Sequence, residues 1–169
     1  MSLKSQDVLV ALKLAARPEV AWSYPRLAAD LSMSASEVHA SVRRATRSGL
    51  LQQDERHTPN RKALLEFLVH GLKYVFPVER GGLTRGMPTA HAAPPLRDQF
   101  AASDDPAPVW PDPEGAVRGE ELAPLYRSVP QAARADERLY ELLALVDALR
   151  GGRARDRELA VKELRTRLA

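Results

Sequence analysis

Hydrophobic residues recur at three- and four-residue steps along several stretches of the chain, and this spacing predicts amphipathic helices. The expected helices span about residues 4–16, 24–31, 35–48, 61–76, 136–150 and 153–168. Proline or glycine follows or separates most of them, at Pro18, Gly49, Pro77 and Gly151–Gly152, and such residues commonly end helices. The pattern therefore predicts a mainly α fold, with residues 126–169 forming a C-terminal helical hairpin.

Residues 77–125 differ in character from the rest of the chain. They hold nine of the 13 prolines and five of the nine glycines. This content excludes regular helix across most of the segment and argues against central strands. A disordered linker has little use for isolated large apolar residues, so an ordered, packed arm is favoured. The anchors expected for that arm are Leu83, Met87, Leu96, Phe100, Val109, Trp110 and Leu122.

The expected helix over residues 61–76 is apolar on nearly every side, whereas a helix on the surface of a monomer shows one apolar stripe. One face should pack on the N-terminal helices. The rest requires a second cover, supplied either by another copy of the chain or by the C-terminal part. Together with the apolar stripe over residues 136–150, this helix predicts a homodimer.

Residues 24–48 have the pattern of two helices joined by a short polar break at residues 32–34. Ser34 and Glu37 fit a capping box, in which each side chain accepts an orphan backbone N–H. Ser23 is a candidate cap for the preceding helix. Val38 and Val42, four residues apart, are expected to point into the core.

Six polar residues of the second helix are then expected on its outer faces. They are Ser36, His39, Ser41, Arg43, Arg44 and Arg47. Arginine binds phosphate and can donate two hydrogen bonds to guanine, and a serine at a helix start can bind phosphate. The alternative is that these residues are solvated or pair with nearby acids; it stays open, most of all for His39 and Ser41.

Residues 27–31 (LAADL), 34–38 (SASEV) and 48–51 (SGLL) resemble the winged helix-turn-helix family of bacterial transcription regulators, in the broad MarR-like or ArsR-like sense. The resemblance covers residues 1–76. It implies a winged-helix-like DNA-binding domain whose second helix, residues 35–48, is a recognition helix in the major groove. Family members follow that helix with two strands and a basic wing. Here only residues 52–60 are available, so the wing should be truncated or lost, with Arg56 at its tip as a further candidate DNA contact.

The charge and composition of the chain limit the classes of function that it can have. The formal net charge is +3, divided as +4 over residues 1–76, −4 over 77–125 and +3 over 126–169. Basic ends around an acidic middle fit a protein that meets phosphate at one surface and another partner elsewhere. The chain has no cysteine, no leader-like start and no apolar run of membrane-spanning length, so we expect a cytoplasmic protein without membrane contact.

Catalytic, metal and cofactor sites find little support in the sequence. The run from Gly81 to Gly86 matches neither the P-loop nor the dinucleotide fingerprint. The four histidines are scattered without metal-ligand spacing. The acidic residues of the arm lie in Pro-rich sequence that does not predict the burial needed for acid–base catalysis. We therefore expect neither an enzyme nor a cofactor.

The favoured interpretation is a sequence-specific double-stranded DNA-binding regulator of transcription, most simply a repressor. The alternative is an antitoxin-like or adaptor protein, whose arm and C-terminal helices bind a protein partner and whose DNA binding serves autoregulation. Residues 145–155 are similar to the tails of small bacterial winged-helix proteins encoded beside nucleotidyltransferase-type toxins. A regulator that senses a small molecule is a third interpretation and would require an apolar pocket.

Overall fold

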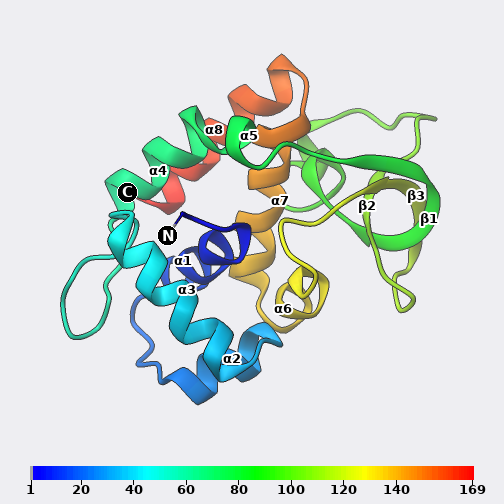
Figure 1. Ribbon diagram of the computed structural model, residues 1–169. Helices are drawn as coiled ribbons and strands as arrows, with labels where there is room; N and C mark the ends of the chain where they lie inside the picture. The colour runs from blue at the N-terminus through cyan, green and yellow to red at the C-terminus, as the bar shows by residue number, and fades with distance from the viewer. Residues whose placement is uncertain (1) are drawn as a thin grey trace.

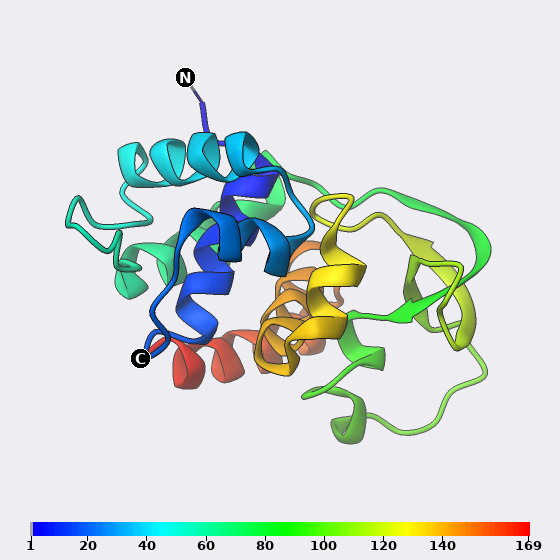
Figure 2. The same ribbon diagram turned by 90° about the horizontal axis from the view of Figure 1, so that it is seen from below.

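Helix α7 (Glu137–Gly151) runs through the middle of the molecule, between the N-terminal helices and a small β-sheet (Figures 1 and 2). The computed structural model describes residues 2–169. Its helices otherwise comprise α1 (Ser5–Ala16), α2 (Tyr24–Leu31), α3 (Ala35–Arg47), α4 (Arg61–His70), α5 (Leu72–Val75), α6 (Val129–Ala135) and α8 (Ala154–Arg167). The prediction of a mainly α fold is confirmed, and α7 and α8 form the predicted hairpin.

The prediction of one long helix over residues 61–76 is wrong in one respect. The helix is divided at Gly71 into α4 and α5. The buried face of this pair consists of Leu64, Leu68 and Leu72. Its cover comes from α7 and α8 of the same chain, which α4 contacts directly. The C-terminal part therefore supplies the second partner that the apolar pattern requires.

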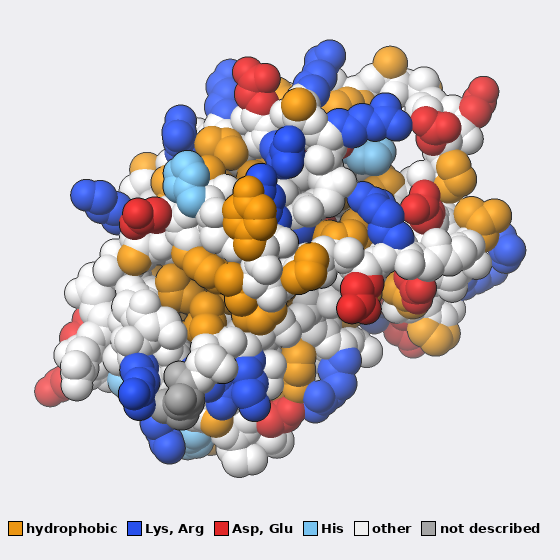
Figure 3. All heavy atoms as spheres, turned by 45° about the horizontal axis from the view of Figure 1, so that its top comes forward, with side chains coloured by type: hydrophobic (Ala, Val, Ile, Leu, Met, Phe, Trp, Pro, Cys, Tyr) orange, Lys and Arg blue, Asp and Glu red, His pale blue; other side chains and the backbone are white. Residues whose placement is uncertain are grey.

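The α4–α5 pair and α7 therefore do not require a second copy of the chain to cover them. Every residue of α7 from Leu142 to Leu149 is buried within the single chain. Among the large apolar residues of α4 and α5, Tyr74 and Val75 remain exposed, at 75% and 52%. Figure 3 shows hydrophobic side chains gathered on one face between groups of Lys and Arg.

Residues 77–125 contain a three-stranded sheet in which one strand is paired on both sides, so the expectation against central strands is wrong. Strand β1 (Arg80–Pro88) pairs antiparallel with both β2 (Pro108–Pro111) and β3 (Val117–Leu122). Strands β2 and β3 pair in parallel, which closes the sheet into a small barrel. The short 3₁₀ helices η1 (Ala90–Ala92) and η2 (Arg97–Gln99) lie in the connection from β1 to β2.

The proline and glycine content of this segment is compatible with strands because of where those residues lie. Three prolines lie at strand ends: Pro88, Pro108 and Pro111. At these positions the missing backbone N–H removes few hydrogen bonds between strands. Glycines allow neighbouring backbones to approach closely. A Cβ on Gly86 would lie 2.0 Å from the carbonyl oxygen of Trp110 on β2, so a larger residue would separate the strands.

The ordered, packed arm that the sequence favours is confirmed by the burial of its anchors. Leu96, Val109, Trp110 and Leu122 are at most 1% exposed. Met87 and Phe100 are half-buried and pack against the core. Leu83 is 58% exposed, so its predicted role as an anchor is wrong.

A buried carboxylate joins this sheet to the central helix. Asp147 on α7 accepts hydrogen bonds from Thr89 Oγ1 and Trp110 Nε1, both at 2.7 Å, and from Arg150 NH1 at 3.0 Å. Burial raises the pKa of the Asp147 carboxyl, and the Arg150 guanidinium opposes that rise. Because Thr89, directly after β1, and Trp110, on β2, both donate to this buried acid, the sheet has a fixed position on α7.

A second buried acid joins the two ends of the chain. Asp136 caps α7 by accepting the backbone N–H of Arg138 at 3.1 Å and that of Leu139 at 3.3 Å. It also pairs with Lys13 Nζ at 2.7 Å and with Arg17 NH2 at 3.0 Å. Just before it lies α6, which the sequence pattern does not predict and which contacts both α2 and α7. The N-terminal helices and the C-terminal hairpin therefore share one core.

Candidate nucleic-acid interface

The start of α3 is held by the capping box predicted from the sequence. Ser34 Oγ accepts the backbone N–H of Glu37 at 3.2 Å, and Glu37 Oε2 accepts that of Ser34 at 2.8 Å. The preceding cap is confirmed too, since Ser23 Oγ accepts the N–H of Arg26 at 3.3 Å. Ser32 ends α2 in the left-handed conformation, with φ 52°, and so allows the tight turn into α3.

One face of α3 is open to solvent and carries four of the predicted residues: Ser36, His39, Arg43 and Arg47. Their spacing of three and four residues places them in one stripe along the helix. The one acid of α3, Glu37, is half-buried, with 28% of its side chain exposed. The structure therefore brings together two guanidinium groups, an imidazole and a hydroxyl along one face of α3.

Ser41 and Arg44 do not belong to that surface, and the prediction that they lie on the outer faces of α3 is wrong. Ser41 is fully buried and Arg44 is 8% exposed. They share the inward face with Val38, Val42 and Ala45, which packs on α1. Neither side chain is positioned to contact a duplex.

Arg44 points inward because it pairs with an acid on α1, a contact that the sequence pattern does not predict. Asp7 is fully buried, and its Oδ2 and Oδ1 accept hydrogen bonds from Arg44 Nε at 2.8 Å and Arg44 NH2 at 2.9 Å. Two parallel bonds between a guanidinium and a carboxylate give a strong and directional pair. The hydrogen bond to Asp7 raises the pKa of Arg44 further.

His39 is exposed but is held by a neighbouring ring. It stacks on Tyr24 with 3.6 Å between ring centroids and 15° between ring planes. Trp22 lies against the other side of this group, with its ring edge-on to Tyr24 at 5.1 Å. The stack limits the rotation of the His39 ring and leaves its edge at the surface of α3.

The segment in which the sequence predicts a truncated or lost wing forms a minimal hairpin over residues 50–60. It contains one antiparallel bridge, between Leu51 and Pro59. The backbone N–H of Gln52 donates to the Thr58 carbonyl at 2.7 Å. Arg56 lies exposed in the hairpin loop, and its carbonyl accepts Trp22 Nε1 at 3.1 Å. This hairpin therefore holds Arg56, next to the exposed Asp54 and Glu55, beside the segment that precedes α2.

The sequence does not predict the contact of two further residues with α3, because they lie some 90 positions further along the chain. Tyr126 Oη donates to Glu37 Oε1 at 2.6 Å, and Arg127 NH2 donates to the same oxygen at 2.7 Å. The Tyr126 hydroxyl, the Ser34 amide and Arg127 lower the pKa of Glu37 to about 2. Arg127 thereby balances the one acid in the first turn of α3 and adds an exposed cation beside it.

Residues 2–169 contain no cluster of three or more His, Cys, Asp or Glu side chains arranged to hold a metal ion. No helix in the described part of the chain combines the length and apolar character needed to cross a membrane.

Comparisons with known protein families, curated proteins and solved structures give no match to this chain.

Alanine substitution of the two consecutive arginines of α3 should affect the stability of the protein to very different extents. Arg44→Ala leaves the buried Asp7 carboxylate without its partner and should lower the free energy of unfolding by about 3 kcal/mol. Arg43→Ala, on the exposed face, should change it by less than about 0.5 kcal/mol. Urea unfolding followed by circular dichroism measures both. Equal effects of the two substitutions would contradict the assignment of Arg44 to the core.

Proposed function

We propose that the protein binds double-stranded DNA by inserting the exposed face of α3 into the major groove. The observation that carries the proposal is the stripe of Ser36, His39, Arg43 and Arg47. It follows a capped helix start, where backbone N–H groups and the helix dipole favour phosphate. The major groove of B-DNA is wide enough to admit an α-helix.

Each residue of the stripe has a distinct chemical role in this proposal. Arg43 and Arg47 supply phosphate contacts or bidentate bonds to guanine. Ser36 binds a phosphate at the helix start. His39, oriented by Tyr24, offers a ring nitrogen to a base edge. Arg56 in the short hairpin and Arg127 beside Glu37 provide further contacts to the DNA backbone on either side of α3.

The biological role that follows is control of transcription, most simply repression by occupying a promoter. The structural support for DNA contact is stronger than that for the protein-partner alternative. The apolar faces of α7 and α8, which an antitoxin-like partner would use, are largely covered by the chain itself. The sheet is likewise fixed to α7 through Asp147.

Salt dependence of DNA binding tests the proposed surface. Arg43→Ala combined with Arg47→Ala should weaken binding to a random-sequence duplex and reduce the slope of log K against log salt by about 2, one unit for each lost phosphate contact. Fluorescence anisotropy with a labelled duplex of about 20 base pairs, or two helical turns, measures both quantities.

The matched control removes two exposed arginines from α8, through Arg157→Ala and Arg165→Ala, and so changes the net charge equally. This control should retain the wild-type slope. A loss of affinity that is the same for both double variants would mean that only net charge matters, and the role of α3 would then be refuted.

We further propose that two copies act together on DNA. A two-fold pair places its recognition helices about 34 Å apart, one helical turn of the duplex, on a palindromic site. Sedimentation of the protein with a short duplex should then give two chains per duplex. A complex with one chain per duplex at saturation contradicts this proposal while leaving DNA binding by a single copy intact.

A further inference from the structure

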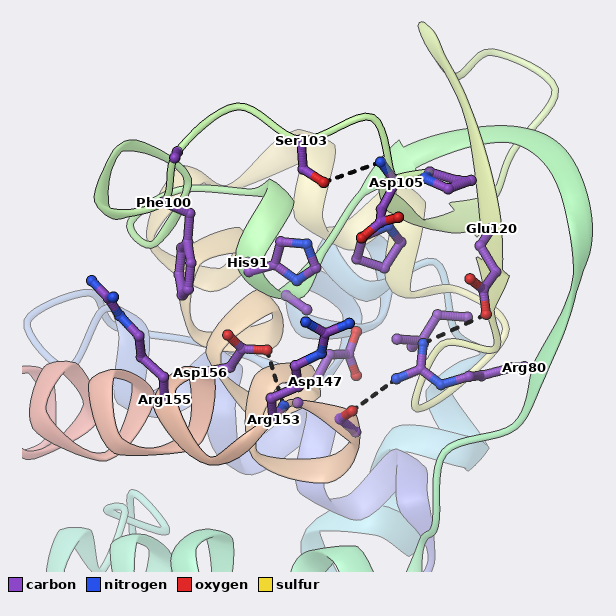
Figure 4. A pocket seen from close by; sticks show the side chains of 17 residues that line it. Arg80, His91, Phe100, Ser103, Asp105, Glu120, Asp147, Arg153, Arg155 and Asp156 are labelled. Carbon is purple, nitrogen blue, oxygen red and sulfur yellow. Dashed lines mark hydrogen bonds and ion pairs between the residues drawn. The ribbon is translucent and has the colours of Figure 1, made fainter.

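The cavity between the sheet and the junction of α7 with α8 has a volume of about 710 Å³ (Figure 4). Its lining holds four carboxylates and three guanidinium groups, so the charges nearly balance. The Phe100 ring lies between the His91 ring and the Arg155 guanidinium, which are 5.7 Å and 5.6 Å from its centroid. The cavity therefore presents neither an excess of charge nor a free aromatic face. Aromatic rings beside α3, in contrast, connect two of the residues proposed to contact DNA.

The hairpin over residues 50–60 has little backbone pairing to fix its position. Its one bridge, between Leu51 and Pro59, is made by two backbone hydrogen bonds of 2.7 Å and 2.9 Å. An isolated two-stranded hairpin is at best marginally stable in water. Side-chain contacts with the rest of the chain are therefore required to hold the loop that carries Arg56.

Two side-chain hydrogen bonds hold this loop. Trp22 Nε1, in the segment before α2, donates to the Arg56 carbonyl at 3.1 Å. His57 Nδ1 lies 3.2 Å from Thr46 Oγ1, in the last turn of α3. The Thr46 hydroxyl donates its one hydrogen to the Val42 carbonyl at 2.7 Å, so it accepts the N–H of His57. The loop is therefore bonded both to α3 and to the segment before α2.

Trp22 also belongs to the aromatic group that orients His39. Its ring lies edge-on to Tyr24, with 5.1 Å between centroids and 84° between planes, a favourable geometry for two aromatic rings. Tyr24 in turn stacks on His39 at 3.6 Å. The centroids of the Trp22 and His57 rings are 6.3 Å apart. One side chain thus contacts both the residue that orients His39 and the loop that carries Arg56.

These rings border one side of the exposed stripe on α3. His39 and Thr46 are seven residues apart, so they lie on the same side of the helix, two turns from each other. Tyr24 stacks on His39, and His57 bonds to Thr46. The aromatic group therefore spans two turns of α3 and reaches the two residues with proposed DNA contacts, His39 and Arg56.

We propose that Trp22 is a positioning residue for DNA recognition. Its ring fixes His39 through Tyr24, and its indole N–H fixes Arg56 through the hairpin loop. The base contact of His39 and the DNA-backbone contact of Arg56 are therefore made as one unit. This inference rests on the proposed DNA binding by α3.

Substitutions at Trp22 and Tyr24 separate the two contacts. Trp22→Phe removes the indole N–H but keeps a ring against Tyr24, so it should reduce the slope of log K against log salt by about 1, as Arg56→Ala does, and keep the base preference. Tyr24→Ala should instead keep the slope and lose about tenfold in preference at one base pair, as His39→Ala does. Trp22→Ala should show both losses. Fluorescence anisotropy with a random-sequence duplex measures the slope, and selection from a library of random duplexes measures the preference.

Combining Trp22→Ala with His39→Ala and Arg56→Ala should cause no loss beyond that of the last two, because all three remove the same contacts. The matched control is Tyr74→Ala, which removes an exposed aromatic ring from α5 and should keep the wild-type slope and base preference. Circular dichroism verifies that each variant folds, and Trp22→Phe carries the test if Trp22→Ala does not fold.

Hydrogen exchange in the free protein separates this inference from DNA binding. The Gln52 amide donates to the Thr58 carbonyl within the hairpin. Trp22→Ala should raise the exchange rate of that amide at least about tenfold, because the hairpin opens more often, whereas Tyr74→Ala should not.

The inference alone is overturned if the wild-type protein binds DNA while Trp22→Ala keeps both the slope and the base preference. Losses that add in the combined variant, or an unchanged slope in Trp22→Phe, overturn it as well. Unchanged Gln52 exchange in Trp22→Ala does so even without DNA. A wild-type protein that binds no duplex refutes both the proposed function and this inference.

Discussion

The buried ion pair between Asp7 and Arg44 determines which face of α3 meets solvent. A guanidinium held by two hydrogen bonds to a carboxylate on α1 fixes the rotation of α3 about its own axis. Rotation of α3 by one residue would expose this pair, and would also remove Val38 and Val42 from the core. The exposed stripe from Ser36 to Arg47 is thus a consequence of what the inward face must bury.

Two further buried acids extend this constraint to the rest of the molecule. Asp136 joins α7 to Lys13 and Arg17 of α1, and Asp147 joins the sheet to α7. The recognition-helix candidate has its own link, through Glu37, to Tyr126 and Arg127 after β3. Such pairs cost desolvation and contribute mainly through geometry. Here they fix α1, α3 and the sheet relative to the central part of the chain.

Local patterns in the sequence predict the helices, the caps and most of the α3 stripe, because 3.6-residue periodicity and capping chemistry depend only on near neighbours. Local patterns do not predict contacts between residues that are far apart in the sequence. Arg43 and Arg44 are adjacent and chemically identical, and only the distant Asp7 distinguishes them. The strands of residues 77–125 escape detection because their prolines lie at strand ends and their glycines serve a neighbouring backbone.

The most direct test of the account is an amide-resolved NMR titration of the protein with a palindromic duplex at moderate salt. The account predicts that the largest shifts fall on Ser36, His39, Arg43 and Arg47, with smaller ones at Arg56 and Arg127, while Ser41 and Arg44 shift little. Shifts centred on the sheet or the α8 start, or no shift at all, would contradict the claim that the orientation set by Asp7 and Arg44 presents α3 to DNA.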